Sequence, residues 1–301
     1  MTDGLSPEQA QTEETFSFKW SKTDTYASPE VRSEWRRWLL EKYFDNDSEG
    51  PAKFLGSRPL RILDAGCGAG ISALLLFGEY LANHDYVGVD ISDSVIEARR
   101  NFGLAGVPGT FVQASLTDLP ADLGTFDLIF SEGVLHHTDS VGDSLAYLAS
   151  RLRPGGRIAF YVYAHKAPIR EFTDDYVREQ IASLSDEDAW NALLPLSALG
   201  KTLGDLGQTV EIPEDIEVLG IEKGTYDLQR LFFYKICKAY YRPEYSLDEM
   251  NHINFDWFRP SNCHRHTVEE VLEMCERSRL EVFRLHAEES GIVIIAQVRG
   301  L

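Results

Sequence analysis

A short glycine-rich segment, ILDAGCGAG at residues 62–70, is the first part of the chain that could do chemistry. Its glycines stand at alternate positions from Gly66 to Gly70, so a nucleotide-like ligand could lie against bare backbone. The dinucleotide-binding pattern G-x-G-x-x-G would need glycine at position 71, where this chain has Ile71. Asp64 precedes the loop, and its carboxylate would repel a pyrophosphate but suits an ammonium group. The loop therefore predicts a nucleoside ligand that carries an amino acid.

The segment NFDWFRPSNCHRHT, residues 254–267, holds a second group of reactive side chains: Cys263, His264 and His266. A zinc site needs four well-spaced ligands, and Cys275 is the one other thiol nearby. We therefore predict no metal. The two histidines are expected to line a substrate pocket or to lie at the start of the helix that follows.

Composition limits the partners of the chain. The 301 residues include 48 Asp and Glu against 29 Lys and Arg, a formal charge of −19, and no basic strip interrupts the acids. Such a surface repels nucleic acid. No window reaches the about 18 consecutive apolar residues of a membrane span, and the acidic N-terminus does not resemble a targeting segment. Four cysteines without C-x-x-C spacing suit a reducing compartment. We expect a cytoplasmic protein with neither a nucleic-acid nor a membrane partner.

The elements that must position these residues alternate between strand-like and helical segments. Five apolar runs rich in branched and aromatic residues predict buried parallel strands: 60–65, 86–90, 110–114, 126–131 and 157–163. Helical patterns lie between them, around 70–82, 92–104 and 140–152. This rhythm predicts an α/β fold with a doubly wound, Rossmann-like sheet.

The C-terminal region completes the predicted sheet. Thr267 and Glu270 form a capping-box pattern that opens a helix. Two strand patterns follow, 280–287 and 291–298, and a turn as short as the one between them requires an antiparallel pair. We therefore expect a seven-stranded sheet whose last strand is antiparallel.

Two segments lie outside this sheet pattern. Residues 165–264 show no strand-like alternation and are expected to form a mostly helical cap, with helices over 168–185, 186–206 and 225–241. At the N-terminus, Ser28 and Pro29 mark the start of an amphipathic helix. The predicted organisation is a disordered tail (1–15), a helical arm or lid (16–45), a core (46–164 and 265–301) and a cap or substrate insertion (165–264).

Four motifs occur in an order that resembles one family: ILDAGCGAG (62–70), VGVDIS (87–92), FDLIFSEGVLHH (126–137) and LRPGG (152–156). With the sheet pattern they cover about 60–164 and 265–301. The chain looks like a class I S-adenosylmethionine-dependent methyltransferase of the small-molecule type. The resemblance implies S-adenosylmethionine as cofactor and S-adenosylhomocysteine as its product.

The resemblance also implies residue roles. The glycine loop would hold the methionine part, with Asp64 near its ammonium, and Asp90 would accept both ribose hydroxyls. Ser115 stands where the family commonly has an aspartate that binds the adenine amino group, which leaves that contact to Ser115 or to a backbone carbonyl. The expected cofactor-binding residues are Asp64, Gly66, Cys67, Gly68, Gly70, Asp90, Ile91, Ala114, Ser115, Leu116, Ser131 and Glu132.

Methyl transfer from a sulfonium is an in-line displacement in which alignment supplies much of the rate, and a base is needed only for a protonated nucleophile. The candidate catalytic residues follow predicted strands four and five: Glu132, His136, His137, Tyr163 and His165. The expected substrate contacts are Phe16, Trp20, Tyr26, Trp257, His264 and His266. Both the N-terminal arm and the aromatic cap could cover the substrate or serve a homodimer.

These residues favour methyl transfer to an O or N atom of a small molecule, such as a specialised metabolite or a sugar in a biosynthetic pathway. The aromatic content leaves C-methylation of an apolar or prenyl substrate as an alternative. A cofactor-binding regulatory or scaffold protein without catalysis is a further alternative.

Overall fold

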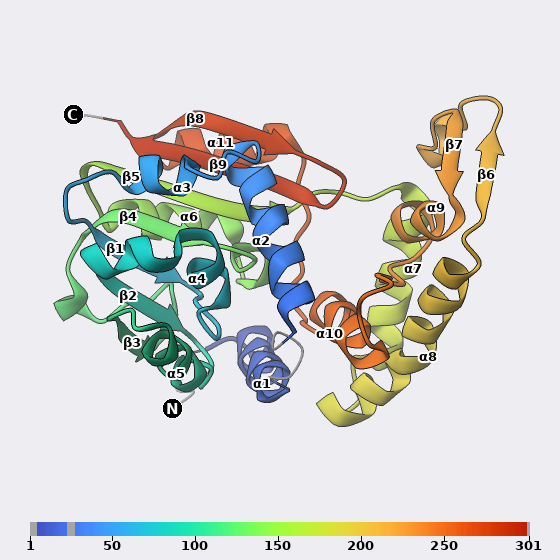
Figure 1. Ribbon diagram of the computed structural model, residues 1–301, viewed down its shortest axis with the longest axis horizontal. Helices are drawn as coiled ribbons and strands as arrows, with labels where there is room; N and C mark the ends of the chain where they lie inside the picture. The colour runs from blue at the N-terminus through green and yellow to red at the C-terminus, as the bar shows by residue number, and fades with distance from the viewer. Residues whose placement is uncertain (1–4, 23–27, 300–301) are drawn as a thin grey trace. The chain divides into compact units, whose positions relative to one another are not determined.

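The predicted alternation of strands and helices is present in the computed structural model, which describes residues 5–22 and 28–299. The chain divides into two units (Figure 1). We call residues up to 164 and from 262 onward the sheet unit, and residues 165–261 the helical unit. The division falls beside the boundaries of the predicted cap.

Seven strands form the sheet of the first unit. They are β1 (Arg61–Ala65), β2 (Asp85–Asp90), β3 (Thr110–Gln113), β4 (Phe126–Ser131), β5 (Leu152–Tyr163), β8 (Leu280–Ala287) and β9 (Gly291–Val298). Their order is β3-β2-β1-β4-β5-β9-β8, and β9 runs antiparallel to both of its neighbours. The predicted fold class, including the antiparallel last strand, is confirmed. Because β1 and β4 are neighbours while β1 leads to β2, the strand order reverses beside β1, where α/β sheets bind their ligands.

Helices cover both faces of this sheet. They are α2 (Pro29–Phe44), α3 (Gly50–Leu55), α4 (Ile71–Phe77), α5 (Val95–Ala105), α6 (Val141–Ser150) and α11 (Val268–Arg277). Helices α2, α4 and α5 place aromatic rings against β2 and β4, whereas α6 and α11 bury apolar side chains against the other face. The predicted caps are present: Ser28 accepts from the Val31 amide, and Thr267 forms a full capping box with Glu270.

The N-terminal tail differs from the prediction. Residues 7–15, expected to be disordered, are the first part of helix α1 (Pro7–Ser21). Ser6 caps this helix by accepting from the Gln9 amide, and its hydroxyl also donates to Asp139 at 2.8 Å. Thr12 and Thr15 are buried. Tertiary contacts therefore stabilise a segment whose composition alone indicates disorder.

The helical unit contains α7 (Pro168–Ile181), α8 (Asp186–Asp205), α9 (Leu228–Lys235) and α10 (Leu247–Phe258). It also contains an antiparallel pair, β6 (Thr209–Ile212) and β7 (Gly224–Asp227), which the sequence pattern of the mostly helical insertion did not indicate. Four residues are too few for a visible alternation. The predicted helix over 225–241 is correspondingly shorter, because Asp227 ends β7 and caps α9.

No helix in the described part of the chain is both long and apolar enough to cross a membrane.

Candidate functional site

The glycine loop leaves the carboxyl end of β1. Gly66, Gly68 and Gly70 all have positive φ angles, +84°, +50° and +75°, a region that side chains other than glycine rarely adopt. A Cβ on Gly66 would lie 2.3 Å from the Val134 side chain. A Cβ on Gly70 would lie 2.7 Å from the Phe102 ring. The bare backbone is therefore required by the loop itself.

Asp90, at the carboxyl end of β2, faces this loop. Its Oδ2 accepts from the Gly68 amide at 2.8 Å, and its Oδ1 accepts from the amide and the hydroxyl of Ser92 at 2.9 and 2.6 Å. A carboxylate has about four acceptor positions. Asp90 has therefore filled three of them and keeps one on Oδ2. The side chain thus fixes the second glycine while it retains capacity for a further hydroxyl donor.

Asp64 lies on β1 in a buried position, 3% exposed. The Tyr86 hydroxyl donates to its carboxylate at 2.5 Å. Burial raises the pKa of Asp64 to about 7, although the Tyr86 hydrogen bond opposes that shift. Burial also raises the pKa of the Tyr86 hydroxyl well above its usual value. The predicted contact between Asp64 and a ligand ammonium therefore has a competitor, because Tyr86 already occupies one carboxylate oxygen.

The other predicted cofactor residues lie at the same edge of the sheet. Ser131 is buried and donates to the Ala65 carbonyl at 2.8 Å, which ties the end of β4 to β1. The Ser115 hydroxyl lies 2.9 Å from that of Thr117 in the turn after β3. The remaining predicted positions are Cys67 and Leu116, which are buried, and Ile91 and Ala114, which are partly buried.

Helix α1 brings two predicted substrate residues to this edge. A Cβ on Gly68 would lie 2.7 Å from the Trp20 indole, so the indole packs directly on the second glycine of the loop. The Phe16 ring lies edge-on to His137, with centroids 5.2 Å apart. The arm therefore contacts both the glycine loop and the segment after β4. Tyr26, the third predicted residue of the arm, lies outside the described residues.

The segment after β4 forms a 3-10 turn, η4 (Leu135–His137), in which both histidines are buried. The His136 ring stacks on Tyr163 of β5, with centroids 3.6 Å apart, and the His137 ring lies 4.3 Å from that of His136. His137 Nδ1 lies 2.7 Å from the Asn262 carbonyl oxygen. Because a carbonyl only accepts, Nδ1 carries the proton, and the neutral ring has its basic lone pair on Nε2.

The segment after the helical unit returns to these side chains. The His264 amide donates to the His136 carbonyl, and the His266 amide donates to the Tyr163 carbonyl, both at 2.9 Å. The His264 and His266 rings are stacked at 6.4 Å, and His266 Nδ1 lies 3.5 Å from Glu270. The structure thus brings together His136, His137, Tyr163, His264 and His266, which are separated by up to 130 residues in the chain.

Glu132, which directly follows β4, has partners that the sequence did not indicate. Its carboxylate accepts from the Lys42 ammonium and, at 2.6 Å, from the Tyr43 hydroxyl, both on α2. Lys42 is fully buried, with its ammonium 3.3 Å from the Trp38 ring and 4.0 Å from the Tyr161 ring. Burial lowers the pKa of Lys42 to about 8, and Glu132 opposes that shift. Lys42 follows Trp38 by four residues, and that spacing was the signal available in the sequence.

Two predicted residues belong to the helical unit. His165 is half-exposed, and its Nδ1 lies 3.8 Å from Glu171. Trp257 is buried, 2% exposed, and its indole N–H donates to Asp174 at 2.8 Å. Among residues 5–22 and 28–299, no group of three or more His, Cys, Asp or Glu side chains could hold a metal ion.

Residues 63–160 match the family model of a methyltransferase domain. An uncharacterized protein of Synechococcus sp. is 40% identical over 147 residues, which are 46% of this chain and 32% of that protein. A tRNA U34 carboxymethyltransferase of Azotobacter vinelandii is 36% identical over 133 residues, 42% of this chain and 38% of that protein. The chain spans about a third of the length of these curated relatives.

Solved structures similar to this chain have low sequence identity. Magnesium protoporphyrin IX methyltransferase of Synechocystis PCC 6803 with bound SAH has a TM-score of 0.49 and 15% identity, over 97% of this chain and 100% of that one. The 1,6-didemethyltoxoflavin-N1-methyltransferase of Burkholderia thailandensis has a TM-score of 0.47 and 16% identity, over 98% of this chain and 91% of that one.

Proposed function

We propose that the chain is a class I S-adenosylmethionine-dependent methyltransferase that transfers a methyl group to an O or N atom of a small molecule, which the match of residues 63–160 to a methyltransferase domain supports. The observation on which this rests is the arrangement of Asp90 and the glycine loop. Three glycines at positive φ shape the backbone at the carboxyl end of β1, and the Asp90 carboxylate beside them keeps an acceptor position.

The residues at this edge fit the cofactor. Asp90 would accept a ribose hydroxyl at Oδ2, and a second hydroxyl would have to share Oδ1 with Ser92. Gly66 and Gly68 would bring backbone close to the methionine part, and the Trp20 indole, which packs on Gly68 and has the Lys19 ammonium 4.6 Å from its centroid, would line the pocket. When bound, S-adenosylmethionine supplies an electrophilic methyl on a positively charged sulfur.

His137 is our candidate for the base. Its Nδ1 proton points at the Asn262 carbonyl, and this contact fixes the ring orientation and leaves Nε2 as the basic atom. Tyr163 supports the neighbouring His136 by stacking. Glu132, by contrast, already accepts from Lys42 and Tyr43, which favours a role as an anchor for α2. His165, on the helical unit beside Glu171, stays a weaker candidate.

Helix α1 would limit the access of water to the reaction. Trp20 contacts the glycine loop and Phe16 contacts His137, so one helix touches both the proposed cofactor site and the proposed base. Exclusion of water strengthens the electrostatic interactions of a site and prevents side reactions. Phe16 and Trp20 are thus proposed to line the pocket rather than to act chemically.

The charge of the chain supports a small-molecule acceptor over nucleic acid. A formal charge of −19 repels a polyanion, although the tRNA U34 carboxymethyltransferases among the relatives make tRNA the alternative acceptor. C-methylation of an apolar substrate would require aromatic faces and a carboxylate, and Glu132 has both oxygens engaged. A scaffold without catalysis would not need a proton acceptor such as His137.

Calorimetric titration with S-adenosylhomocysteine tests the cofactor assignment. Wild-type protein should bind it, and Asp90→Ala should weaken binding about 100-fold, since hydrogen bonds to a charged group contribute about 1.5–3 kcal/mol each. Asp93→Ala, which removes an exposed carboxylate three residues away, is the matched control and should bind like wild type. If Asp90→Ala binds as tightly as the control, Asp90 does not hold the ribose.

The base assignment has its own test. His137→Gln should abolish the rise of kcat/KM with pH that a neutral imidazole base produces, while binding of S-adenosylhomocysteine stays unchanged. His286→Gln, which alters a histidine on β8 that is not among the proposed site residues, is the control and should keep the rise. An unchanged pH profile in His137→Gln would remove the histidine from the mechanism.

A further inference from the structure

Arg170, on α7 of the helical unit, is a buried cation with most of its hydrogen-bonding capacity unused. Its side chain is 2% exposed, and its Nε donates to Asp174 at 3.1 Å. Within the described residues, its two terminal amino groups have no hydrogen-bond acceptor. A guanidinium has five N–H donors in a rigid fork, so four of the five remain to be satisfied. Among the described residues, neither amino group belongs to the fully buried side-chain atoms that lack a hydrogen-bond partner, so the small exposed part of Arg170 lies at these two groups.

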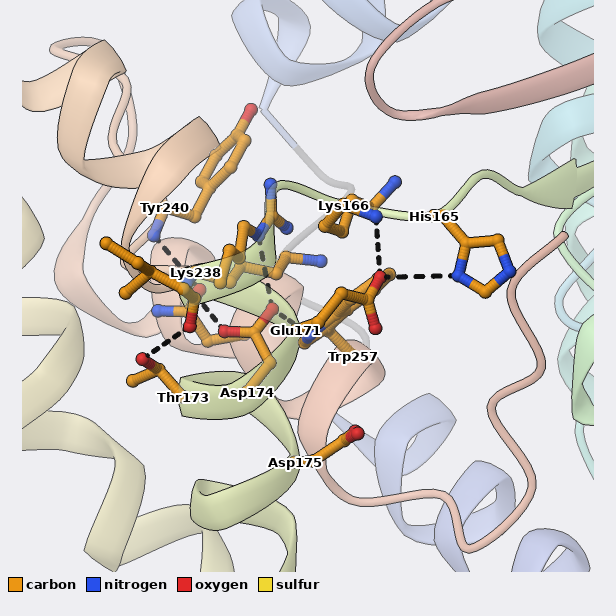
Figure 2. Close-up of polar contacts among 12 residues, drawn as sticks. His165, Lys166, Glu171, Thr173, Asp174, Asp175, Lys238, Tyr240 and Trp257 are labelled. Carbon is orange, nitrogen blue, oxygen red and sulfur yellow. Dashed lines mark hydrogen bonds and ion pairs between the residues drawn. The ribbon is translucent and has the colours of Figure 1, made fainter. Parts of the chain in front are cut away.

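Asp174 does not accept from the terminal amino groups of Arg170, because its contacts with other residues hold the carboxylate in place. Its Oδ2 also accepts from the Trp257 indole N–H at 2.8 Å, and its Oδ1 accepts from the Lys238 amide at 3.0 Å. Figure 2 shows Asp174 beside Lys238 and Trp257. The carboxylate therefore orients Arg170 through Nε and leaves the outer edge of the guanidinium, with both amino groups, directed elsewhere.

Aromatic rings hold the guanidinium from its sides. The Arg170 guanidinium carbon lies 4.7 Å from the Phe233 centroid and 5.2 Å from the Trp257 centroid. Guanidinium groups stack on aromatic rings without using their N–H donors. With Asp174 at Nε and two rings against it, the fork is fixed in orientation before any ligand arrives.

Three more cationic side chains lie around the Trp257 ring. The ammonium groups of Lys238 and Lys166 lie 4.8 and 5.3 Å from the Trp257 centroid, and the Arg178 guanidinium lies 5.3 Å from it. Glu171 accepts from the Lys166 amide (Figure 2). Asp175 lies 3.9 Å from Arg178. Residues 165–261 have 18 acids against ten Lys and Arg, so four cations around one indole are a local reversal of the unit's charge.

We infer that the outer edge of Arg170 binds the carboxylate of a small organic acid, with Lys238 and Lys166 contributing attraction. The planar fork of a guanidinium matches the two oxygens of a carboxylate and forms two parallel hydrogen bonds with it. Two oxygens of an inorganic phosphate can accept from the same fork, and the experiment distinguishes phosphate from carboxylate. That this organic acid is the methyl acceptor rests on the proposed function; the binding does not.

Titration calorimetry with sodium acetate and sodium phosphate, at constant ionic strength in sodium chloride, tests the site on the full chain. Wild-type protein should bind acetate in the millimolar range and more tightly than phosphate. Arg170→Gln should weaken acetate binding at least tenfold. Arg230→Gln is the matched control, because Arg230 also lies over the Phe233 ring, at 5.7 Å, and donates to the Tyr241 carbonyl. It should bind acetate like wild type.

Arg170→Lys keeps the ion pair with Asp174 and the charge but loses the fork, so it covers the case in which Arg170→Gln does not fold. It should also bind acetate about tenfold more weakly. Equal acetate affinity in wild type and Arg170→Lys would overturn the proposal, as would no detectable acetate binding by wild type. Tighter binding of phosphate than of acetate would replace the carboxylate by a phosphate. Loss of S-adenosylhomocysteine binding with retained acetate binding would contradict only the proposed function.

Discussion

Lys42 in the sheet unit and Arg170 in the helical unit are two buried cations with the same kinds of neighbour. Each is paired with a carboxylate, Glu132 for Lys42 and Asp174 for Arg170, and each lies over aromatic rings, three for Lys42 and two for Arg170. The ammonium of Lys42 is compact, and one carboxylate together with three aromatic rings surrounds it. The guanidinium of Arg170 has four donors left over. Similar surroundings therefore complete an internal anchor in one unit and leave a ligand site in the other.

The largest expected effect tests whether the Lys42 pair is a closed anchor. Lys42→Met leaves the Glu132 carboxylate buried without its cation and should lower the free energy of unfolding by about 3–5 kcal/mol. The double variant Lys42→Met with Glu132→Gln should recover most of this loss, because no charge remains buried. Denaturant unfolding of the three proteins measures the effect. A single variant as stable as wild type would mean that the pair is not an anchor.

The Lys42 pair also makes the stability of the protein depend on pH, because the Lys42 ammonium can lose its proton in the accessible range. Burial lowers the pKa of Lys42 from 10.5 to about 8. Between these values the unfolded chain holds a proton that the folded chain has lost, so stability rises with pH, by about 3 kcal/mol over that window. The rise should be absent from the Lys42→Met, Glu132→Gln double variant. Parallel pH profiles of unfolding in the two proteins would contradict the lowered pKa.

The tryptophan beside each cation, Trp257 for Arg170 and Trp38 for Lys42, can be compared by the stability lost when it is replaced by phenylalanine. Trp257→Phe removes an indole N–H donor to the buried Asp174 carboxylate and should cost about 2 kcal/mol beyond the loss of ring area. Trp38→Phe removes a donor to the part-buried Glu288, 3.1 Å away, and should cost less than about 1 kcal/mol beyond the same loss. Unfolding measurements on both variants compare the two. An equal cost would indicate that Asp174 does not depend on the indole.

The smallest expected effect is the stabilisation of the protein by acetate, which should depend on Arg170 and not on Lys42. Acetate at ten times its dissociation constant should stabilise wild-type protein by about 1.4 kcal/mol relative to chloride. Lys42→Met should gain as much, since its change lies in the other unit, whereas Arg170→Gln should gain nothing. Thermal unfolding in the two salts at equal ionic strength reports the difference. Equal stabilisation of all three proteins would mean that acetate stabilises the fold by a general salt effect and not by binding at Arg170.

Most of the sheet unit could be predicted from the sequence, because its strands are continuous apolar runs and its loops have recognisable glycines and caps. The strand pair 280–287 and 291–298 appears in the structure with the predicted bounds. Helix α1 could not be predicted, since its buried residues are Thr12, Thr15 and Lys19, and only tertiary contacts show which of its faces is covered. In the helical unit, strands of four residues were too short to show a period.

The candidate site was predictable at the positions set by local pattern, such as Asp90 and the glycines. The partners of these residues were not predictable, because they come from distant segments. Tyr86 bonds to Asp64, and Lys42 bonds to Glu132 from 90 residues away. Arg170 and Asp174 have the i, i+4 spacing of any exposed helical ion pair, and only the structure shows that they are buried.

The most direct test of the account is a transfer assay with methyl-labelled S-adenosylmethionine. Wild-type protein would be incubated with a pool of neutral and carboxylate-bearing small molecules and, in parallel, with bulk tRNA, and the label followed in each fraction. The account predicts label in the carboxylate-bearing small molecules, little in tRNA, and loss of the label in Asp90→Ala. Label found in tRNA, or none transferred to any small molecule by protein that binds S-adenosylhomocysteine, would contradict it.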